Sequence, residues 1–162
     1  HATEYRPKVG VFTLSDSISS GNGEDKSGPI IIDGFKNTGC IVDHNVVLPD
    51  GSEELIPIVK DWANKGVELI ITTGGTGLGP RDLTIETLEG AFVSKLPGVE
   101  QAIHAYGRGK VKTAMLSRLT AGVVDGSIVI CLPGSTGATK DALKVLIPTI
   151  FHSFHMMKGE KH

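Results

Sequence analysis

The fold is decided by Val67-Glu68-Leu69-Ile70-Ile71-Thr72-Thr73-Gly74-Gly75-Thr76-Gly77-Leu78-Gly79-Pro80-Arg81-Asp82. The first five residues are mostly apolar and are typical of a buried strand. Four glycines then fall within six residues at the carboxyl end of that strand. Because glycine has no side chain, such a cluster leaves backbone N–H groups exposed, and these form a concave site for an anion, most often a phosphate. Arg81 and Asp82 follow directly, so the stretch predicts phosphoryl or nucleotidyl chemistry.

Strand-like and helix-like segments alternate on both sides of this stretch, which favours a parallel sheet covered on both faces. We expect a single α/β domain with three layers (α/β/α) and a doubly wound, mostly parallel sheet. The expected strands are 8–14, 40–48, 67–73 and 127–132. The expected helices are 28–38, 53–65 capped by Ser52, 84–88, 97–106, 113–119 and 136–157, the last one kinked or broken at Pro148.

Composition narrows the class of protein. A chain of 162 residues with 40% hydrophobic residues fits one domain with a substantial core. The net charge of −2 argues against a nucleic-acid surface, and no apolar run reaches the roughly 20 residues of a membrane span. Cys40 and Cys131 form no CxxC pair and are expected to be buried free thiols in a reducing compartment. We therefore expect a cytoplasmic protein, and interpret His1 as a processed or excised end.

Four polar clusters follow the predicted strands. They are Ser15-Asp16, Pro49-Asp50, the glycine loop (residues 74–82, ending at Asp82), and Pro133-Gly134-Ser135. In doubly wound folds ligands bind beyond the carboxyl ends of the strands, so these clusters predict one composite site. The glycine loop matches neither the Walker A motif nor the dinucleotide fingerprint. A tight strand-to-helix turn is its alternative explanation, although one or two glycines would satisfy such a turn.

The carboxylates Asp50 and Asp82 follow different strands and could converge on one divalent cation. Magnesium usually takes one or two carboxylates together with substrate phosphates. The alternatives are a turn role for Asp50 in Pro-Asp-Gly, and a cap or a salt bridge to Arg81 for Asp82. Ser15-Asp16 could orient a ligand or cap the next segment.

Two further polar groups have open alternatives. Ser117-Arg118 offers an anion-binding pair or a surface arginine, and Pro133-Gly134-Ser135 could approach a nucleotide or be a plain loop. His152 and His155 lack a third ligand, which argues against zinc. No Gly-x-Ser-x-Gly elbow is present, which disfavours a covalent hydrolase.

Together these motifs closely resemble the signature of molybdopterin adenylyltransferases, the MogA and MoaB proteins and the G domain of gephyrin. The resemblance rests on the glycine loop through Thr84 and on four further blocks in the same order. These blocks are Leu14-Ser15-Asp16, Pro49-Asp50, Leu116-Ser117-Arg118 with Ala121-Gly122, and Leu132-Pro133-Gly134-Ser135. It implies a molybdopterin-binding domain at 8–158, an N-terminal extension at 1–7 and a C-terminal tail at 159–162.

Some details of the resemblance concern the subtype. Ile85 and Thr136 stand where prolines are usual in the family, and neither change removes a polar group. The end of the chain, from Ile150 to His162, is similar to the MogA-like half of bacterial fusions with a MoaC-type domain.

The resemblance implies transfer of AMP from Mg-ATP to the terminal phosphate of molybdopterin, with release of pyrophosphate. Asp50 and Asp82 would be catalytic and would hold Mg²⁺. The positions expected to bind substrate or nucleotide are Ser15, Asp16, Thr73, Gly74, Gly75, Thr76, Gly77, Arg81, Ser117, Arg118, Gly122, Pro133, Gly134 and Ser135.

The resemblance also bears on partners. It implies a homotrimer and handover of product to a molybdenum-insertion enzyme, while the charge and the hydropathy of the chain argue against a nucleic-acid or membrane partner. The alternatives are a non-catalytic molybdopterin- or nucleotide-binding member, a CinA-like nucleotide pyrophosphatase, and a scaffold like the gephyrin assemblies, which would need additional domains.

Overall fold

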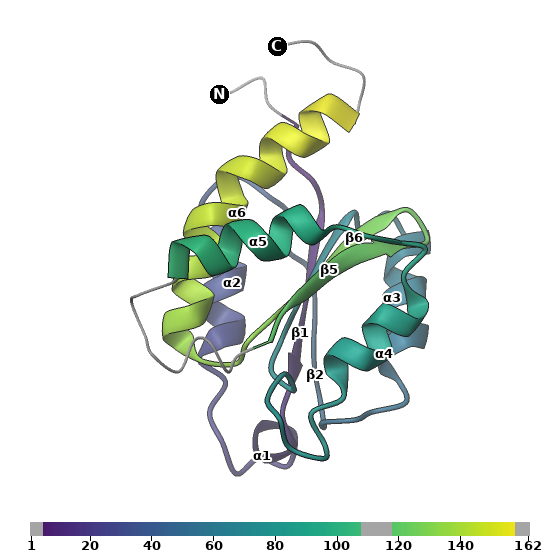
Figure 1. Cartoon of the computed structure of the whole chain (residues 1–162), viewed down its shortest axis with the longest axis vertical. Helices are drawn as coiled ribbons and strands as arrows, with labels where there is room; N and C mark the ends of the chain where they lie inside the picture. The colour runs from purple at the N-terminus through teal and green to yellow at the C-terminus, as the bar shows by residue number, and fades with distance from the viewer. Residues whose placement is uncertain (1–4, 108–117, 158–162) are drawn as a thin grey trace.

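The computed structural model describes residues 5–107 and 118–157. Its centre is a six-stranded sheet in the order β2-β1-β3-β6-β5-β4 (Figure 1). The parallel strands are β1 (Val9–Leu14), β2 (His44–Leu48), β3 (Leu69–Thr73) and β6 (Ser127–Leu132). On the far side of β6 the strands β5 (Thr120–Val124) and β4 (Ser94–Lys95) run antiparallel to their neighbours. The predicted, mostly parallel sheet is thereby confirmed.

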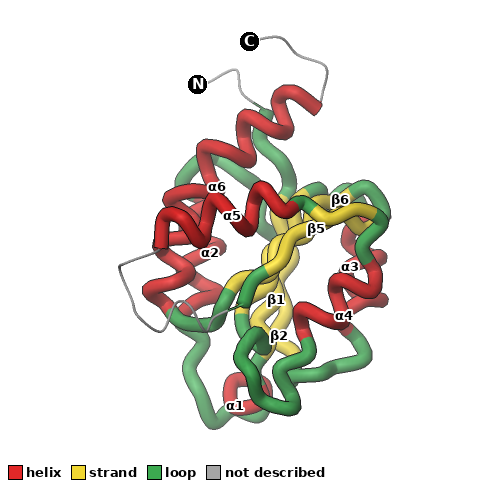
Figure 2. The backbone as a smooth tube through the Cα atoms, in the orientation of Figure 1, coloured by secondary structure: helices red, strands yellow, loops and turns green. Residues whose placement is uncertain are grey.

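Helices cover both faces of this sheet, as predicted (Figures 1 and 2). One core contains α2 (Ser27–Lys36), α5 (Pro97–Gly107) and α6 (Thr136–Met157), whereas the other contains α3 (Leu55–Asn64) and α4 (Thr84–Ala91). Successive strand residues alternate between the two cores: Leu69 and Ile71 pack in the first, and Ile70 packs in the second. Because side chains of a strand point alternately to its two faces, a continuous apolar run is what this three-layer arrangement requires.

Two strands were not predicted. Thr120–Val124 forms β5 and joins β6 through a two-residue turn at Asp125 and Gly126, with φ values of 49° and 85°. Both residues have the positive φ of the turns that favour Asp-Gly in tight hairpins. The predicted helix at 113–119 is wrong for Arg118 and Leu119, which lie outside any helix or strand. The rest of that prediction lies outside the described residues.

Several element ends also differ from the prediction. β2 begins at His44 instead of residue 40, since its continuous register with β1 starts there; before it, the Val9 N–H donates to the Ile41 carbonyl at 3.0 Å outside that register. α3 begins at Leu55, and Ser52 accepts a hydrogen bond from the Glu54 N–H at 3.1 Å in the turn before it, without capping the helix. α6 continues through Pro148 without a break.

Other parts of the prediction needed smaller changes. The segment between the expected strand at 8–14 and the expected helix at 28–38 contains a short helix, α1 (Asp16–Ser19). Both cysteines are buried free thiols, as expected. Among the described helices, none combines the length and the hydropathy needed to cross a membrane.

Candidate functional site

Four loops meet at the carboxyl edge of the parallel strands. The loop after β1 is joined to β2 by a 2.9 Å hydrogen bond from the Ser15 N–H to the Leu48 carbonyl. The loop after β3 is joined to β6 by a 3.1 Å hydrogen bond from the Gly74 N–H to the Leu132 carbonyl. This is the edge at which the predicted polar clusters were expected to gather.

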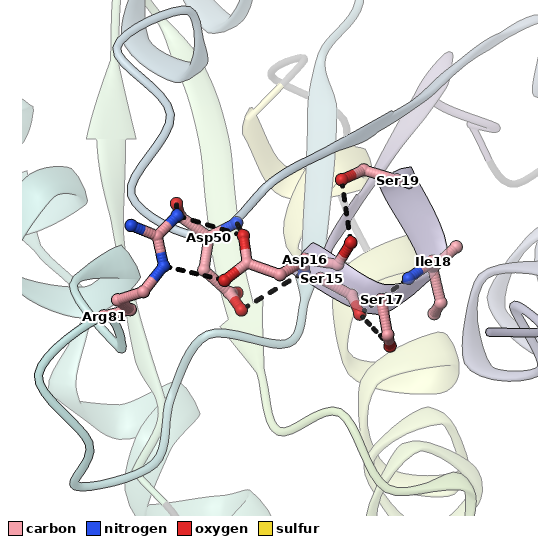
Figure 3. A network of polar contacts seen from close by, with 7 residues as sticks. All are labelled: Ser15, Asp16, Ser17, Ile18, Ser19, Asp50 and Arg81. Atoms are coloured by element: carbon pink, nitrogen blue, oxygen red, sulfur yellow. Dashed lines mark hydrogen bonds and ion pairs between the residues drawn. The ribbon is translucent and has the colours of Figure 1, made fainter. Parts of the chain in front are cut away.

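Asp16, Asp50 and Arg81 form one network across three of these loops (Figure 3). The Asp16 N–H donates to Asp50 Oδ2 at 3.3 Å, and the Asp50 N–H donates to Asp16 Oδ1 at 3.1 Å. Arg81 donates to the two oxygens of the Asp16 carboxylate, from Nε at 2.7 Å and from Nη2 at 3.0 Å. Its Nη2 also donates to the Asp50 carbonyl at 2.7 Å. Ser15 caps α1 by accepting from the Ile18 N–H at 3.2 Å.

The two aspartates of this network differ in their electrostatics. The hydrogen bonds from Arg81 hold the pKa of Asp16 below its usual value of 3.8. The pKa of Asp50 is raised, chiefly by burial and further by the charges of Asp16 and Asp82, while the Asp16 N–H and Arg81 oppose the shift. Asp50 Oδ1 is buried and has no hydrogen-bond partner among the described residues. Burying such an oxygen costs free energy unless a cation or a hydrogen-bond donor contacts it.

Two glycines at the start of the loop are required by its geometry. Gly74 and Gly75 have φ values of 97° and 66°, in the region that L side chains rarely adopt. A Cβ at Gly74 would overlap the Leu14 carbonyl oxygen, and one at Gly75 would overlap the Thr84 hydroxyl. That second Cβ would also lie 3.3 Å from Asp50 Oδ1, so the unpartnered oxygen faces the glycine loop.

Asp82 closes the far end of the same loop. Its Oδ2 accepts from the Gly79 N–H at 3.0 Å, and its own N–H donates to the Gly79 carbonyl at 3.1 Å. A Cβ at Gly77 or at Gly79 would lie 2.9 Å from Asp82 Oδ2. Asp82 therefore has a local turn role, whereas the salt bridge of Arg81 goes to Asp16.

Arg118 holds the glycine loop from the opposite side. Its Nε donates to the Thr76 carbonyl at 3.2 Å, and its Nη2 donates to the Gly77 and Asp82 carbonyls at 2.8 and 3.0 Å. Its Nη1 contacts both carboxylate oxygens of Glu86, at 2.7 and 3.2 Å. All three guanidinium nitrogens are thus engaged by the protein itself. Ser117, the other half of the predicted anion-binding pair, lies outside the described residues.

The loop after β6 packs against the start of the glycine loop. Thr73 Oγ1 donates to the Pro133 carbonyl at 3.0 Å, and a Cβ at Gly134 would lie 3.3 Å from Gly74 Cα. Ser135 begins α6 by accepting from the Ala138 N–H at 3.2 Å. These residues lie at the predicted edge, but their contacts within the chain are structural.

Gly122 is not brought to this edge. It lies inside β5, paired with Val129 of β6, and a Cβ there would overlap the ring of Phe92. Glycine is needed here because the Phe92 ring occupies the space that a side chain would fill.

Three residues that anchor the loop after β1 were not predicted. Thr13 Oγ1 donates to Asp25 Oδ2 at 2.8 Å, and Asp25 Oδ1 accepts from the Gly28 N–H at 2.9 Å at the start of α2. Ser27 Oγ donates to the Gly134 carbonyl at 2.8 Å, which ties this loop to the one after β6. Pro29 lies in the first turn of α2, and a proline there is a sequence signal of the helix start that Asp25 and Ser27 flank.

Within the described ranges 5–107 and 118–157, no group of three or more His, Cys, Asp or Glu side chains is arranged to hold a metal ion. Asp50 contributes one free hard oxygen, and Asp82 lies near enough for its charge to raise the pKa of Asp50. A hard cation binding here would take protein carboxylates together with oxygens from its ligand.

Comparisons with known proteins place the chain in a family. Residues 10–152 match the family model described as a probable molybdopterin binding domain. The chain is 50% identical over 161 residues to a molybdenum cofactor biosynthesis bifunctional protein of Chlorobaculum tepidum, covering 99% of this chain and 52% of that protein. It is 36% identical to a molybdopterin adenylyltransferase of Pyrococcus furiosus, covering 90% of this chain and 88% of the relative.

The structural comparison gives the same result. A molybdopterin biosynthesis protein from Mycobacterium abscessus superposes with a TM-score of 0.89 at 29% identity, covering 96% of this chain and 98% of that structure. The chain spans about half the length of the bifunctional relatives that it matches, with 52% and 48% of their lengths covered. The family model, the sequence relatives and the shared fold together show that the chain belongs to the MogA/MoaB family of molybdopterin-binding domains of molybdenum cofactor biosynthesis.

Proposed function

We propose that this domain transfers AMP from Mg-ATP to the terminal phosphate of molybdopterin and releases pyrophosphate. An oxygen of the pterin phosphate attacks the α-phosphorus of ATP, and the bond from that phosphorus to the oxygen bridging to the β-phosphate breaks. Pyrophosphate leaves with the bonding electron pair. Because the nucleophile is a phosphate, the enzyme needs no covalent group, and catalysis is mainly positioning and charge neutralisation.

The observation that carries this proposal is the unpartnered Asp50 Oδ1 beside the glycine loop. It is buried, it faces Gly75, and no described donor completes it. A fold that needed Asp50 only for its turn would satisfy both carboxylate oxygens or expose them. A buried carboxylate oxygen next to a loop of phosphate-binding type fits a cation that arrives with a polyphosphate.

Asp50 and Asp82 are the residues that would hold the magnesium ion. Magnesium usually takes one or two carboxylates and completes its octahedral shell with water and substrate phosphates. When bound, it would neutralise charge on the triphosphate and on the departing pyrophosphate.

The other loops would position the two substrates. Backbone N–H groups of the glycine loop would cradle phosphate oxygens, and Arg81 would add a positive charge at the same edge. Ser15 and Asp16 would shape the side that receives the pterin phosphate, and Gly134 and Ser135 would lie near the nucleotide.

Known relatives support the proposal by their names. One relative that is 36% identical is named molybdopterin adenylyltransferase, and the relative at 50% identity is named bifunctional. We extend the proposal to a MogA-like half of a fusion with a MoaC-type domain, to assembly as a homotrimer, and to handover of the adenylylated pterin to a molybdenum-insertion enzyme.

The test is incubation of the protein with molybdopterin and Mg-ATP, with separate assays of pyrophosphate and adenylylated molybdopterin. We expect the two products in equal amounts and no pyrophosphate when the pterin is omitted. Binding of pterin or ATP without either product would support a non-catalytic member of the family and contradict the proposal. Cleavage of a dinucleotide in the absence of pterin would instead support a CinA-like pyrophosphatase.

A further inference from the structure

Arg118 donates hydrogen bonds to the carbonyl oxygens of two consecutive peptide units of the glycine loop. The Thr76 and Gly77 carbonyls both point at its guanidinium, at 3.2 and 2.8 Å. All the described peptide bonds are trans. In a trans peptide the C=O of one residue and the N–H of the next point in opposite directions. The N–H groups of Gly77 and Leu78 therefore point away from Arg118.

These two N–H groups have no acceptor within the described part of the chain. Others in the same loop are used: the Gly74 N–H donates to Leu132, the Gly79 N–H to Asp82, and the Thr84 N–H to Gly75. Arg118 thus leaves two adjacent donors with the same orientation, which is the arrangement that binds an oxyanion.

Glu86 fixes Arg118 in this position. Its carboxylate meets Nη1 of Arg118 at 2.7 and 3.2 Å from the first turn of α4, and the arginine side chain is about one-third exposed, at 34%. Leu119, the next residue, is buried in the core and anchors the backbone of Arg118. The guanidinium is therefore held between α4 and the start of β5, with all of its nitrogens engaged.

We propose that Arg118 is a positioning residue that acts through the glycine loop and does not itself contact the substrate. With Glu86 as its anchor, it turns the Gly77 and Leu78 N–H groups toward the polyphosphate of the nucleotide. The ATP role of this loop rests on the proposed function, whereas its capture of a polyphosphate is testable without any transfer reaction.

Glu86→Ala distinguishes this positioning role from direct phosphate binding by Arg118, because the two predict opposite changes in the affinity for polyphosphate. If Arg118 bound phosphate directly, removal of Glu86 would free its charge and strengthen polyphosphate binding. If Arg118 acts through the loop, loss of its anchor weakens binding. Arg118→Lys is the second variant, because lysine keeps the charge but lacks the planar fork that spans three carbonyls. Direct binding would survive that change in large part, since lysine also binds phosphate well.

The matched control is Glu89→Ala. Glu89 lies on the same helix and is paired to Lys95 at 2.7 Å, but none of its contacts involves the glycine loop. It tests whether loss of any carboxylate from α4 changes anion binding by a general charge effect.

The experiment is titration of the ¹⁵N-labelled protein with inorganic tripolyphosphate, followed through the Gly77 and Leu78 amide resonances. We expect both resonances to shift in the wild type and in Glu89→Ala, and affinity to fall about tenfold in Glu86→Ala and in Arg118→Lys. Unchanged or tighter binding in Glu86→Ala, or no shift of these amides in the wild type, would overturn the inference. If the wild type binds tripolyphosphate in this way but transfers no AMP, the proposed function fails and the role of Arg118 stands.

Discussion

Asp16 and Asp50 accept hydrogen bonds from each other's backbone N–H groups, at 3.1 and 3.3 Å, across the ends of two neighbouring strands. The reciprocal pair sets their carboxylates close together, and Arg81 neutralises only one of them, Asp16. Asp50 is left with a raised pKa and one unpartnered buried oxygen. The site therefore maintains a poorly solvated carboxylate, which is unfavourable for folding alone and useful for binding a cation.

Asp50→Asn is expected to stabilise the protein and to abolish AMP transfer. The substitution removes a half-buried charge that Asp16 and Asp82 repel, so the free energy of unfolding at pH 7 should rise; because solvent screens a partly exposed carboxylate, the gain should stay below about 1 kcal/mol. The rate of transfer should fall by about 100-fold or more, since the substitution removes the carboxylate proposed to hold magnesium against the reacting phosphates. Denaturant unfolding and the pyrophosphate assay check the two effects. Asp61→Asn, at an exposed aspartate paired to Lys65 at 2.9 Å, is the matched control and should produce neither.

The stability gain of Asp50→Asn should depend on pH. Folding raises the pKa of Asp50 above 3.8, so the folded state favours the protonated form. In the wild type, the protonated Asp50 therefore stabilises the folded state fully below pH 3.8. This stabilisation is lost as the pH rises through the pKa that Asp50 has in the folded state. The gain should thus be greatest at pH 7 and vanish below pH 3.8. Thermal midpoints of both proteins between pH 3 and pH 7 give the measurement, and a gain that is independent of pH would contradict the assignment.

Arg81→Lys is expected to impair the reaction with little effect on stability. Lysine keeps the positive charge but loses the fork that joins both Asp16 oxygens and the Asp50 carbonyl. Because the pair is exposed, the thermal midpoint should change by less than about 2 °C, while kcat/KM for ATP falls about tenfold. A normal kcat/KM would show that this network does not position the site.

Gly74→Ala is expected to destabilise the domain. The residue has a φ of 97°, and a Cβ would overlap the Leu14 carbonyl oxygen, so the substitution should lower the free energy of unfolding by about 2 kcal/mol or more. Gly90→Ala in α4 has open space around its Cβ and should stabilise the helix by about 0.5–1 kcal/mol. Equal effects of the two substitutions would contradict the strained conformation assigned to Gly74.

Much of the site followed from the sequence because it depends on local patterns. An apolar run ending in Gly74 and Gly75 predicted both a buried strand and a tight loop, and parallel strands bring the residues after them to one edge. The structure confirms this placement for Asp16, Asp50 and Asp82, while their roles in metal binding and transfer stay predictions.

Contacts between distant segments were not predictable in the same way. Arg118 binds carbonyls about 40 residues earlier in the chain, at Thr76 and Gly77, and no spacing rule relates the two segments. β5 was missed because Thr-Ala-Gly-Val-Val is short and contains Ala and Gly, which are depleted in strands. Only the Asp125-Gly126 pair signalled its hairpin. Gly122, expected from the family resemblance to bind substrate, lies within this strand and packs under Phe92, and its binding role stays a prediction.

The fate of the α-phosphate of ATP tests the central claim most directly. The protein is incubated with molybdopterin and Mg-ATP labelled with ³²P at the α-phosphorus, and the products are separated. We predict that the label moves from ATP to the pterin and that Asp82→Ala, although folded, transfers none. Label recovered as free AMP, label remaining in ATP, or near-normal transfer by Asp82→Ala would contradict the account.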